Sequence, residues 1–489
     1  MSSNLEIIRK ILSSQNQESV RDIELQLKSR ALQHLDSNGN TFCTTVTAAP
    51  TPVNLNDYEA VERIQPDLNV VLDNLSKDTD VIIEHLSHIA THDPLAKGLL
   101  EIYKELPESH QDKIILSLNR HDFMYATPDP TSEEAYLNGQ FKLVEYNLIA
   151  SSLGPLTEGV YHYHRSLLNK LNVDTSHFNN KVNTIRGYSE GLRTGYQLYN
   201  TKYKCGGRCV LVMVDDDGPQ FNYFDQQLIL NALETSGVPT IRFTAQYLVD
   251  NGTVVDGRYF VDEMEVAVLY FRTMYDPAHF KTPDFWRARR DMEFSTAVTV
   301  PCVRHQVVNM KLFQMLLSQR NILQKYTSSP EATEDILRLF CDTLPLNLDE
   351  EGDKNAQLGI DHLDQYVLKP QREGGGNNLW DQEMKEKLIS LAEDPARAQF
   401  ILMRKITPPV LKNKFVRRGV MSEELDTVSE FGYYSVYCTN DSSKVVENKV
   451  VGPLIRTKGA TENEGGVAVG ISAIDSPFFI ENSESSSIP

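Results

Sequence analysis

Three consecutive glycines, Gly374–Gly376, follow a short apolar segment that has the length and composition of a strand. The stretch reads LKPQREGGGNNLW, from Leu368 to Trp380. Each glycine inside a helix or strand costs roughly 0.5–1 kcal/mol relative to alanine, so the run disfavours regular structure. Flexible linkers are usually rich in Gly and Ser and uncharged, whereas this run directly follows a Lys, an Arg and a Glu. The glycines therefore predict a loop with a role beyond joining two segments.

The residues before the glycines carry the groups that a bound polyphosphate requires. Lys369 supplies an ammonium at the end of the strand, and a glycine loop can present several backbone N–H groups to phosphate oxygens. Glu373 adds a carboxylate, which is an oxygen ligand that suits Mg²⁺. The order of residues excludes a Walker A loop, in which Lys follows the glycines. We interpret the segment as part of a nucleoside triphosphate site; the alternative is a solvated charged turn.

Two further polar clusters fit the same interpretation. In KLVEYNLIASSLG, Glu145 and Asn147 are two residues apart on an expected strand and therefore share one face. They could complete a Mg²⁺ shell with Glu373, or simply form a polar strand face. In PLIRTKGATENEGGVAVG, Arg456 and Lys458 share a strand face before a second glycine loop. Together the three clusters predict a two-sided cradle for anions.

The apolar spacing predicts a mixed α/β chain. Residues 59–76 and 93–106 have helical spacing, and residues 328–340 begin a helix with Ser329 as N-cap. From Arg208 a strand, a helix and two strands predict a small α/β lobe of about a hundred residues. The remaining expectations are an exposed acidic loop at 349–357, a strand at 365–370 and paired strands at 443–458.

Length and charge limit the classes of protein and partner. A chain of 489 residues is expected to form two or three lobes. A formal net charge of -19 disfavours a nucleic acid or anionic membrane as partner. We expect no membrane span, because no stretch approaches the roughly 18 apolar residues required. The N-terminus lacks the apolar core of a signal peptide, so we expect a cytoplasmic protein, with secretion as the alternative if a leader has been removed.

The six cysteines are sparse. Cys205 and Cys209 flank Gly-Gly-Arg, but no second pair follows, which argues against a zinc site. Reduced thiols, as in cytosolic proteins generally, are the expectation.

The segment VLKPQREGGGNNL closely resembles the glycine-rich signature of eukaryotic-type glutathione synthetase, a family of ATP-grasp ligases. The similarity extends over residues 49–479. Further matching segments are NRHDFM at Asn119–Met124, EYN..ASS at Glu145–Ser152, NYFDQ at Asn222–Gln226, YFRTMY at Tyr270–Tyr275, ILMRKI at Ile401–Ile406 and LIRTKGATENEGGVAVG at Leu454–Gly470.

The resemblance implies both a fold and an activity. Members join γ-glutamylcysteine to glycine with cleavage of ATP to ADP and phosphate, through an acyl phosphate, and use Mg²⁺, with two ions expected beside ATP. They are homodimers with an ATP-grasp body, an inserted substrate lobe and a mobile lid. On this basis we expect an N-terminal helical part and first part of the body at 1–207, the inserted lobe at 208–310 and the rest of the body at 311–489, with the lid at about 366–420.

The resemblance also assigns roles to residues by position. Glu145, Asn147 and Glu373 correspond to metal ligands. The ATP contacts are expected at Lys311, Lys369, Gly374, Gly375, Gly376, Asn378, Met403, Lys405, Glu430 and Lys458. The substrate contacts are expected at Arg120, Ser152, Gln220, Asn222, Gln226, Arg272, Tyr275, Arg456, Val467 and Ala468. Arg120, Lys369 and Arg456 are the expected catalytic residues.

Four positions differ from the family pattern. Ala150 replaces a Ser that contacts the dipeptide, and Gln220 aligns with a Glu expected to bind its ammonium group. Met274 replaces a Gly, and Arg404 replaces an acidic residue beside adenine. These changes leave two alternatives open: a ligase of the same mechanism with an altered dipeptide or amine, and a nucleotide-binding paralogue that acts through protein contacts. The phosphoryl-transfer chemistry is therefore a firmer expectation than the substrate.

Overall fold

The computed structural model describes residues 2–14, 20–107, 110, 113–132, 135–136, 138–173, 175, 181–206, 208–371, 376–468 and 470–480. In this part of the chain, nine strands form a central sheet in the order β18–β17–β3–β21–β20–β19–β5–β6, with β16 paired to β19. Its long members are β5 (Ile115–Ala126), β6 (Gln140–Asn147), β19 (Leu425–Thr439) and β20 (Val445–Gly459). The short ones are β3 (Val46–Thr47), β16 (Leu411–Asn413), β17 (Phe415–Arg417), β18 (Val420–Met421) and β21 (Ala473–Asp475).

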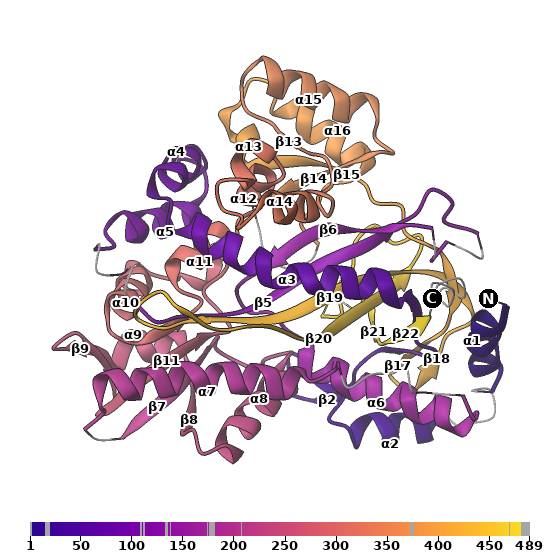
Figure 1. Ribbon diagram of the computed structural model, residues 1–489, viewed down its shortest axis with the longest axis horizontal. Coiled ribbons are helices and arrows are strands. Elements are labelled where there is room, and N and C mark those ends of the chain that lie inside the picture. Colours follow the sequence, from indigo (N-terminus) through magenta and orange to yellow (C-terminus); the bar gives the residue numbers. More distant parts are fainter. Residues whose placement is uncertain are drawn as a thin grey trace.

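Helices pack on both faces of the central sheet, because the long strands carry apolar side chains on both sides. Helix α3 (Leu55–Ser76) crosses one face, and α6 (Gly154–Lys170) and α7 (Thr184–Tyr203) cover the other (Figure 1). Two adjacent tyrosines on β19 show how successive side chains point to opposite faces of the sheet. The ring of Tyr433 lies 4.8 Å from Tyr58 of α3, whereas the ring of Tyr434 lies 5.6 Å from Tyr188 of α7.

Glycines one turn apart allow α7 to approach the sheet closely. A Cβ atom on Gly187 would lie 2.3 Å from the Val451 side chain, and one on Gly191 would lie 2.6 Å from Val436. Both distances are shorter than any tolerated carbon–carbon contact, so only glycine fits at this interface. The helix therefore lies directly against the strands that carry the candidate site.

A second sheet follows α7 in the chain. Its strands lie in the order β8–β7–β11–β10–β9, with β12 beside β11, and the β8, β7, β11 and β12 neighbours are parallel. They are β7 (Cys209–Asp215), β8 (Thr240–Thr244), β9 (Gly252–Val255), β10 (Arg258–Val261), β11 (Met264–Phe271) and β12 (Val298–Val300). Helices α8 (Tyr223–Thr235), α9 (Ala245–Asn251) and α10 (Pro283–Phe294) connect them. The strand, helix, strand pattern expected after Arg208 is confirmed.

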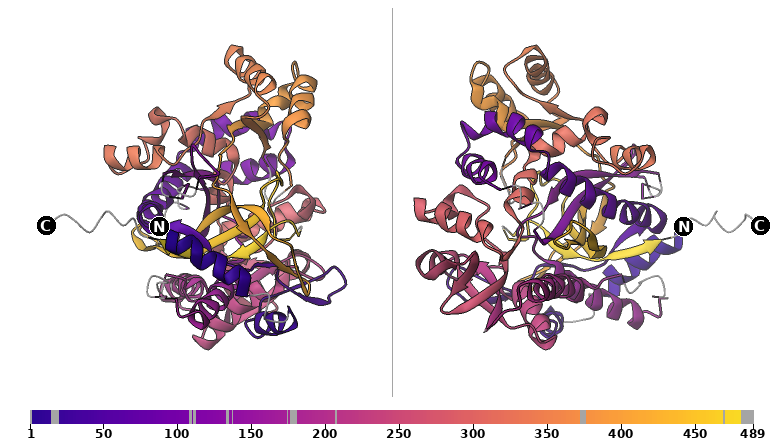
Figure 2. Two further views of the ribbon diagram at one scale, coloured as in Figure 1. Left: turned by 90° about the vertical axis from the view of Figure 1, so that its right-hand side faces the viewer. Right: turned by 60° about the vertical axis from the view of Figure 1, so that its left-hand side comes forward.

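A small unit with its own apolar core stands at the top of Figure 1, and Figure 2 shows it from two other sides. It contains the three-stranded sheet β13–β15–β14 and two helices. Buried Leu368, Met384, Leu388 and Leu402 form its core. The elements are β13 (Thr343–Pro345), β14 (Tyr366–Pro370), β15 (Phe400–Arg404), α15 (Glu350–Asp361) and α16 (Asp381–Ser390).

The remaining elements are shorter or peripheral. The helices are α1 (Ser2–Ser14), α2 (Val20–Lys28), α4 (Thr79–Ala90), α5 (Pro94–Lys104), α11 (Val303–Val308), α12 (Lys311–Leu317), α13 (Arg320–Leu323) and α14 (Pro330–Leu337), with 3₁₀ turns at Pro277–His279 and Pro395–Gln399. The strands are β1 (Gln33–Leu35), β2 (Thr41–Cys43), β4 (Thr51–Asn54) and β22 (Pro477–Ile480). Within the described residues, no helix is both long and apolar enough to cross a membrane.

The expectation of an acidic loop at 349–357 is wrong, because this segment forms most of α15. Asp349 is its N-cap and accepts a hydrogen bond from the Gly352 N–H at 2.7 Å. Three further acidic residues, Glu350, Glu351 and Asp353, lie in the first turn. Negative charge there is favourable because the free N–H groups give the helix a positive end. The acidic run is therefore a helix start rather than a solvated loop.

Candidate active site

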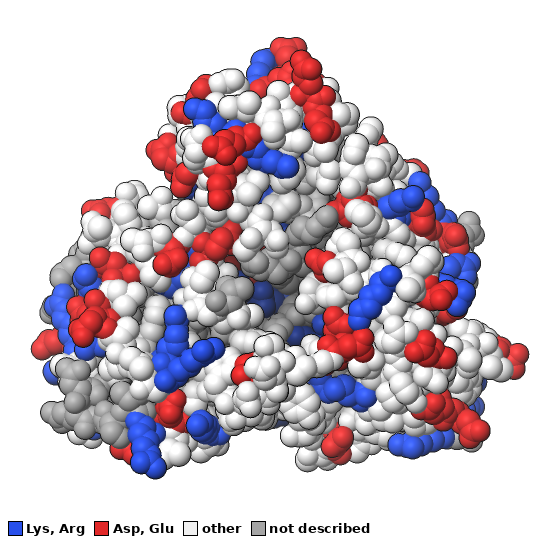
Figure 3. Space-filling model, turned by 180° about the vertical axis from the view of Figure 1, so that it is seen from behind, with Lys and Arg blue, Asp and Glu red and all other residues white. Residues whose placement is uncertain are grey.

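Side chains from six separate elements surround one cavity of about 170 Å³, here called the cationic cavity. The strands β5, β6, β14, β19 and β20 and the helix α12 each contribute a polar residue to it. Figure 3 shows blue Lys and Arg atoms in the hollow beneath the uppermost unit. The predicted residues that line this cavity are Arg120, Glu145, Asn147, Lys311, Lys369, Asn378, Glu430, Arg456 and Lys458. The structure thus brings together residues that are up to 338 positions apart in the sequence.

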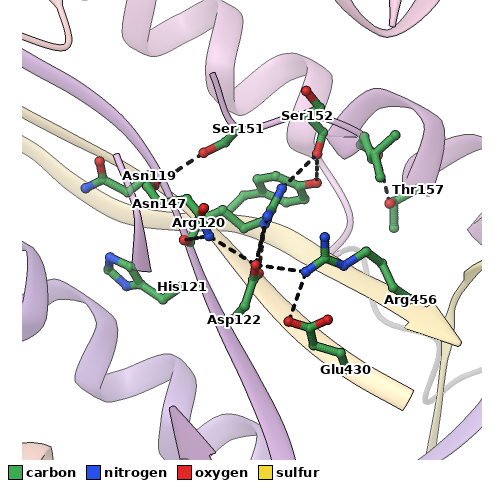
Figure 4. Close-up of polar contacts among 12 residues, drawn as sticks. Asn119, Arg120, His121, Asp122, Asn147, Ser151, Ser152, Thr157, Glu430 and Arg456 are labelled. Atoms are coloured by element: carbon green, nitrogen blue, oxygen red, sulfur yellow. Dashed lines mark hydrogen bonds and ion pairs between the residues drawn. The ribbon is translucent and has the colours of Figure 1, made fainter. Parts of the chain in front are cut away.

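Asp122 joins the two arginines of the cavity, and sequence reasoning did not identify it (Figure 4). Its carboxylate accepts from Arg120 Nε at 2.7 Å and from Arg456 Nη2 at 3.0 Å, while its side chain is fully buried. Arg456 also pairs with Glu430 at 2.9 Å. The one available signal was the position of Asp122, two residues after Arg120 on the same strand and hence on the same face. Asp122 fixes both guanidinium groups at the floor of the cavity.

Glu145 faces the lysines of the cavity. Lys311 Nζ lies 3.5 Å from Glu145 Oε2, and Lys369 Nζ donates to the carbonyl of neighbouring Val144 at 3.1 Å. Burial alone would raise the pKa of Glu145, but Lys311, Lys369 and nearby arginines lower it to about 2. The carboxylate therefore stays ionised under all physiological conditions. Burial has the opposite effect on Lys369 and lowers the pKa of its ammonium.

Asn147 is oriented by its amide nitrogen. Nδ2 donates to Asp122 Oδ2 at 3.1 Å, so the side-chain oxygen is the atom left to accept from a donor or bind a cation. An ionised carboxylate and an amide oxygen on one strand are ligands of the type that Mg²⁺ prefers. Glu373, the third predicted ligand, lies outside the described residues, as do Gly374 and Gly375. No cluster of three or more His, Cys, Asp or Glu residues suited to a metal occurs in the described part.

A second cavity, of about 220 Å³, adjoins the first and has mainly apolar walls. Predicted Met403 and Lys405 line it, and Lys369 and Lys458 border both cavities. Arg404 also lines it but forms an ion pair with Asp342 at 3.6 Å and is more than half exposed. An apolar cavity bordered by two lysines has the properties of a nucleobase pocket next to a phosphate site.

The small unit contacts the C-terminal glycine loop above the cationic cavity. Glu464 accepts from the Trp380 indole N–H at 2.9 Å and from the Gly376 N–H at 3.2 Å. Gly376 has φ +88°, a conformation that favours glycine. Both partners of Glu464 belong to the segment that follows β14, so Glu464 connects the predicted lid to the body.

A second group of predicted residues lies beside the first and is centred on Ser152. Its hydroxyl accepts from Asn222 Nδ2 at 3.0 Å and from Arg272 Nη2 at 2.5 Å. Its carbonyl accepts from Arg120 Nη1 at 3.3 Å and from the Tyr434 hydroxyl at 2.6 Å. Arg120 therefore links the Ser152 group directly to the cationic cavity.

In the described part of the chain, no hydrogen bond joins the other predicted substrate residues to Ser152. Gln226 accepts from Arg242, which also pairs with Asp215. Gln220 donates to the Asp216 carbonyl at 2.9 Å, within its own loop. Tyr275 lies in the same loop as Arg272, and Val467 is buried in the main core. Neither Val467 nor Ala468 is among the residues that line the two cavities.

Two of the positions that differ from the family pattern share an unusual backbone conformation. Ala150 and Met274 have φ of +52° and +65°, in the left-handed region that favours glycine. The Met274 carbonyl accepts from Gln306 Nε2 at 2.6 Å, and the Met274 side chain packs in the core of the second sheet together with Ala150. These two turns flank Ser152 and Arg272, so strain is concentrated beside the second group.

Asp225 gives this region a pH dependence that can be measured. Burial raises its pKa from 3.8 to about 6, although Arg272 and the Leu153 N–H oppose the shift. Because its pKa is raised in the folded state, the protonated Asp225 carboxyl favours folding. This contribution to the unfolding free energy is complete below pH 3.8 and is lost as the pH rises through about 6.

We therefore expect the unfolding free energy of the wild type, relative to Asp225→Asn, to fall by about 2–3 kcal/mol between pH 4 and pH 7.5. Chemical denaturation of both proteins across this range measures the difference. A constant difference in unfolding free energy between the two proteins does not matter, because only the change of that difference with pH reports the titration of Asp225. A pH-independent difference would show that Asp225 has an ordinary pKa.

Comparison with known proteins agrees with this arrangement. The family model described as eukaryotic glutathione synthase, ATP binding domain, matches residues 18–479. Glutathione synthetase of Xenopus laevis is 34% identical over 437 residues, which cover 88% of this chain and 89% of the relative. Glutathione synthetase of Homo sapiens is 32% identical over 426 residues and 86% of each chain.

A solved structure shows the same fold. The apo form of a glutathione synthetase-like effector from Globodera pallida superposes with a TM-score of 0.74 over 97% of this chain and 98% of the other, at 17% identity. The expected mixed α/β fold of the ATP-grasp type is confirmed. Because the family model covers almost the whole chain, this protein belongs to the eukaryotic glutathione synthase family.

Proposed function

We propose that the protein is an ATP- and Mg²⁺-dependent ligase that joins γ-glutamylcysteine and glycine to give glutathione, ADP and phosphate. The observation that carries this proposal is the cationic cavity, where an ionised carboxylate and an oriented amide face buried lysines and arginines. Lys311, Lys369 and Arg120 are 6%, 5% and 7% exposed, respectively. Desolvated cations in fixed positions stabilise the charge that develops during phosphoryl transfer.

The residues present fit a magnesium ion. Glu145 and Asn147 supply a carboxylate and an amide oxygen on one strand, and we propose Glu373 as a third ligand. Bound Mg²⁺, with two ions expected beside ATP, would neutralise phosphate charge and orient the γ-phosphoryl group. We propose that Lys311, Lys369 and Lys458 bind the phosphates, with Gly374–Gly376 and Asn378 over them. The adenine ring would occupy the adjoining apolar cavity beside Met403 and Lys405, with Glu430 near the adenosine.

The residues of the cationic cavity and the residues around Ser152 would act on different parts of the reaction. Ser152, Asn222 and Arg272 would bind the dipeptide, with Gln220, Gln226 and Tyr275 around it. Arg120 contacts both groups, so it can hold the reacting carboxylate against the γ-phosphate until the acyl phosphate forms. We propose that Arg456, Val467 and Ala468 receive the glycine whose amine displaces phosphate. Closure of the lid would exclude water that otherwise hydrolyses the acyl phosphate.

A ligase of the same mechanism with a different dipeptide or amine is the second candidate. The strained turns at Ala150 and Met274 beside Ser152 and Arg272 favour it, since they change the surroundings of the predicted dipeptide site. A non-catalytic paralogue has less support, because the predicted metal ligands and phosphate-binding lysines are all present in the sequence.

One assay separates these functions. Purified protein is incubated with ATP, Mg²⁺ and γ-glutamylcysteine, with and without glycine, and phosphate release is measured together with product mass. Glycine-dependent glutathione supports the first function, turnover only with another amine or dipeptide supports the second, and ATP binding without turnover contradicts both. The Glu373→Ala variant is the control and should lose turnover while keeping its fold.

We also propose the division 1–207, 208–310 and 311–489, a homodimer and a cytoplasmic location. The counter-proposal of secretion is tested by expressing the natural gene and locating its product.

Glu464 provides a test of lid closure. In Glu464→Gln, one carboxylate oxygen becomes an NH₂ group that cannot accept, so either the Trp380 or the Gly376 N–H loses its acceptor. Replacing a charge-assisted hydrogen bond costs about 1–2 kcal/mol, so KM for ATP should rise about tenfold. Phosphate released without product should also increase, because water enters the site.

Steady-state kinetics with parallel phosphate and product measurements gives both values. Glu386→Gln is the matched control, since Glu386 lies on α16 of the small unit, borders neither cavity and accepts a hydrogen bond from Gln382 at 3.2 Å. If Glu464→Gln and wild type share one KM and one ratio of phosphate to product, Glu464 does not hold the lid.

A further inference from the structure

Cys205 and Cys209 form a close pair, and neither of them lines the two cavities. Their sulfur atoms are 2.7 Å apart, compared with about 2.05 Å in a disulfide bond. Cys205 follows the end of α7, and Cys209 is the first residue of β7. Both are free thiols here, so only a short movement separates them from a covalent bond.

The backbone on both sides of the pair is fixed. Arg258 Nη2 donates to the Tyr203 carbonyl at 2.7 Å, which anchors the end of α7, and the Tyr196 hydroxyl donates to the Cys209 carbonyl at 3.2 Å. Arg258 also pairs with Glu265 at the start of β11. These hydrogen bonds fix the end of α7 and the start of β7 and so hold the two sulfurs together. Little conformational entropy is therefore lost when the sulfurs bond.

This pair differs from the other cysteines. In the part of the chain that the structure describes, no sulfur–sulfur contact joins Cys43, Cys302, Cys341 or Cys438 to another cysteine. Cys205 is half-buried and open to a small reagent, while Cys209 is buried behind it. An accessible thiol next to a buried one is the arrangement of an attacking and a resolving cysteine; burial raises the pKa of both thiols, so exchange should be faster in alkaline than in neutral buffer.

We propose that Cys205 and Cys209 are a site of reversible disulfide formation through exchange with a low-molecular-weight disulfide. The Cys205 thiolate attacks one sulfur of the reagent, forms a mixed disulfide and releases one thiol. Cys209 then loses its proton and attacks Cys205 Sγ, which releases the second thiol. Two protein thiols are oxidised, the reagent is reduced to two thiols, and the steps reverse with excess thiol.

This inference does not depend on the proposed ligase activity and modifies the expectation that all six cysteines are simply reduced. The bond would tie α7, which lies against the central sheet, to the first strand of the second sheet.

The sequence makes the bond easy to detect. Trypsin cleaves after Lys204 and Arg208, so the reduced protein yields the peptide CGGR separately from the peptide that begins at Cys209. The full-length protein is equilibrated with glutathione disulfide, its remaining thiols are alkylated, and intact mass and tryptic peptides are measured. We expect the alkylated thiols to fall from six to four and the two peptides to remain linked until reduction. Six alkylated thiols at equilibrium, or linkage to another cysteine, overturns the proposal.

Two variants sharpen the test. Cys209→Ser should stop at a glutathione adduct on Cys205, whereas Cys341→Ser, a half-buried cysteine elsewhere, should still lose two thiols. The oxidised wild type should also melt at a higher temperature than the reduced form, and Cys205→Ser should show no such shift. A Cys209→Ser protein that still loses two thiols without an adduct would assign the chemistry to other residues and contradict the proposal.

Discussion

Replacing Glu145 by Gln is expected to lower kcat by about 10²–10³-fold, the range typical for removal of one preorganised electrostatic group. The substitution keeps the shape of the side chain but removes the negative charge that faces Lys311 and Lys369. The apparent affinity for Mg²⁺ should fall as well, because an amide is a weaker ligand than a carboxylate whose pKa is held at about 2. Initial rates over a Mg²⁺ titration, with unfolding curves for both proteins, measure these effects.

Glu447→Gln is a matched control for this experiment. Glu447 also lies on a long strand of the central sheet and pairs with a lysine, Lys449, at 2.8 Å, but it borders neither cavity. Its substitution should leave kcat and the Mg²⁺ dependence unchanged. Wild-type turnover and Mg²⁺ dependence in Glu145→Gln would disprove the role proposed for this strand.

The local parts of the site could be predicted from the sequence, because strand geometry alone decides which neighbours share a face. Glu145 with Asn147, and Arg456 with Lys458, are two residues apart, and the structure places both pairs on the wall of one cavity. Their individual roles remain predictions. The glycines that first indicated the site lie mostly outside the described residues, so the geometry rests on the strands on either side of the cavity.

The long-range parts could not be predicted in the same way. Asp122 meets Arg456 across 334 positions of sequence, and no local pattern distinguishes it from an ordinary polar strand residue. Propensity argues against the left-handed conformations of Ala150 and Met274, which carry a Cβ, and the Gly that the family has in place of Met274 is the one indirect signal. Tertiary contacts, such as the Gln306 amide on the Met274 carbonyl, decide these positions.

The small unit contains one segment that was predicted correctly and one that was not. The apolar run before the glycines predicts its strand β14, whereas α15, which precedes the predicted lid at 366–420, forms where negative charge alone predicts an exposed loop. Four acidic residues at the start of a segment are also a signal for a helix N-terminus, which Asp349 confirms as the N-cap. Composition and capping therefore have to be weighed together in charged segments.

Asp122→Asn should damage both stability and activity, because Asp122 orients three cavity residues at once. Oδ2 accepts from Arg120, Arg456 and Asn147, and Oδ1 accepts from Arg120 Nε, so the amide loses either the bond at Oδ1 or those at Oδ2, and its new NH₂ group faces other donors. Removing one partner of a buried ion pair costs about 3–5 kcal/mol. Misplaced guanidinium groups should lower kcat/KM by about 10²–10³-fold.

A double-mutant cycle separates orientation from general destabilisation. Asp122→Asn, Arg456→Met and the double variant are compared by chemical unfolding, and we expect the double variant to be more stable than the sum of the single losses predicts. The reason is that Asp122→Asn leaves the Arg456 guanidinium with Glu430 as its remaining carboxylate partner, and Arg456→Met removes that guanidinium. Asp475→Asn, which alters a buried carboxylate bonded to Thr51 and Thr457 in the same sheet, should lose stability but retain kcat. If the losses in unfolding free energy of the two single variants add up to that of the double variant, Asp122 and Arg456 are energetically independent. The orientation of Arg456 in the cavity would then have to come from other contacts.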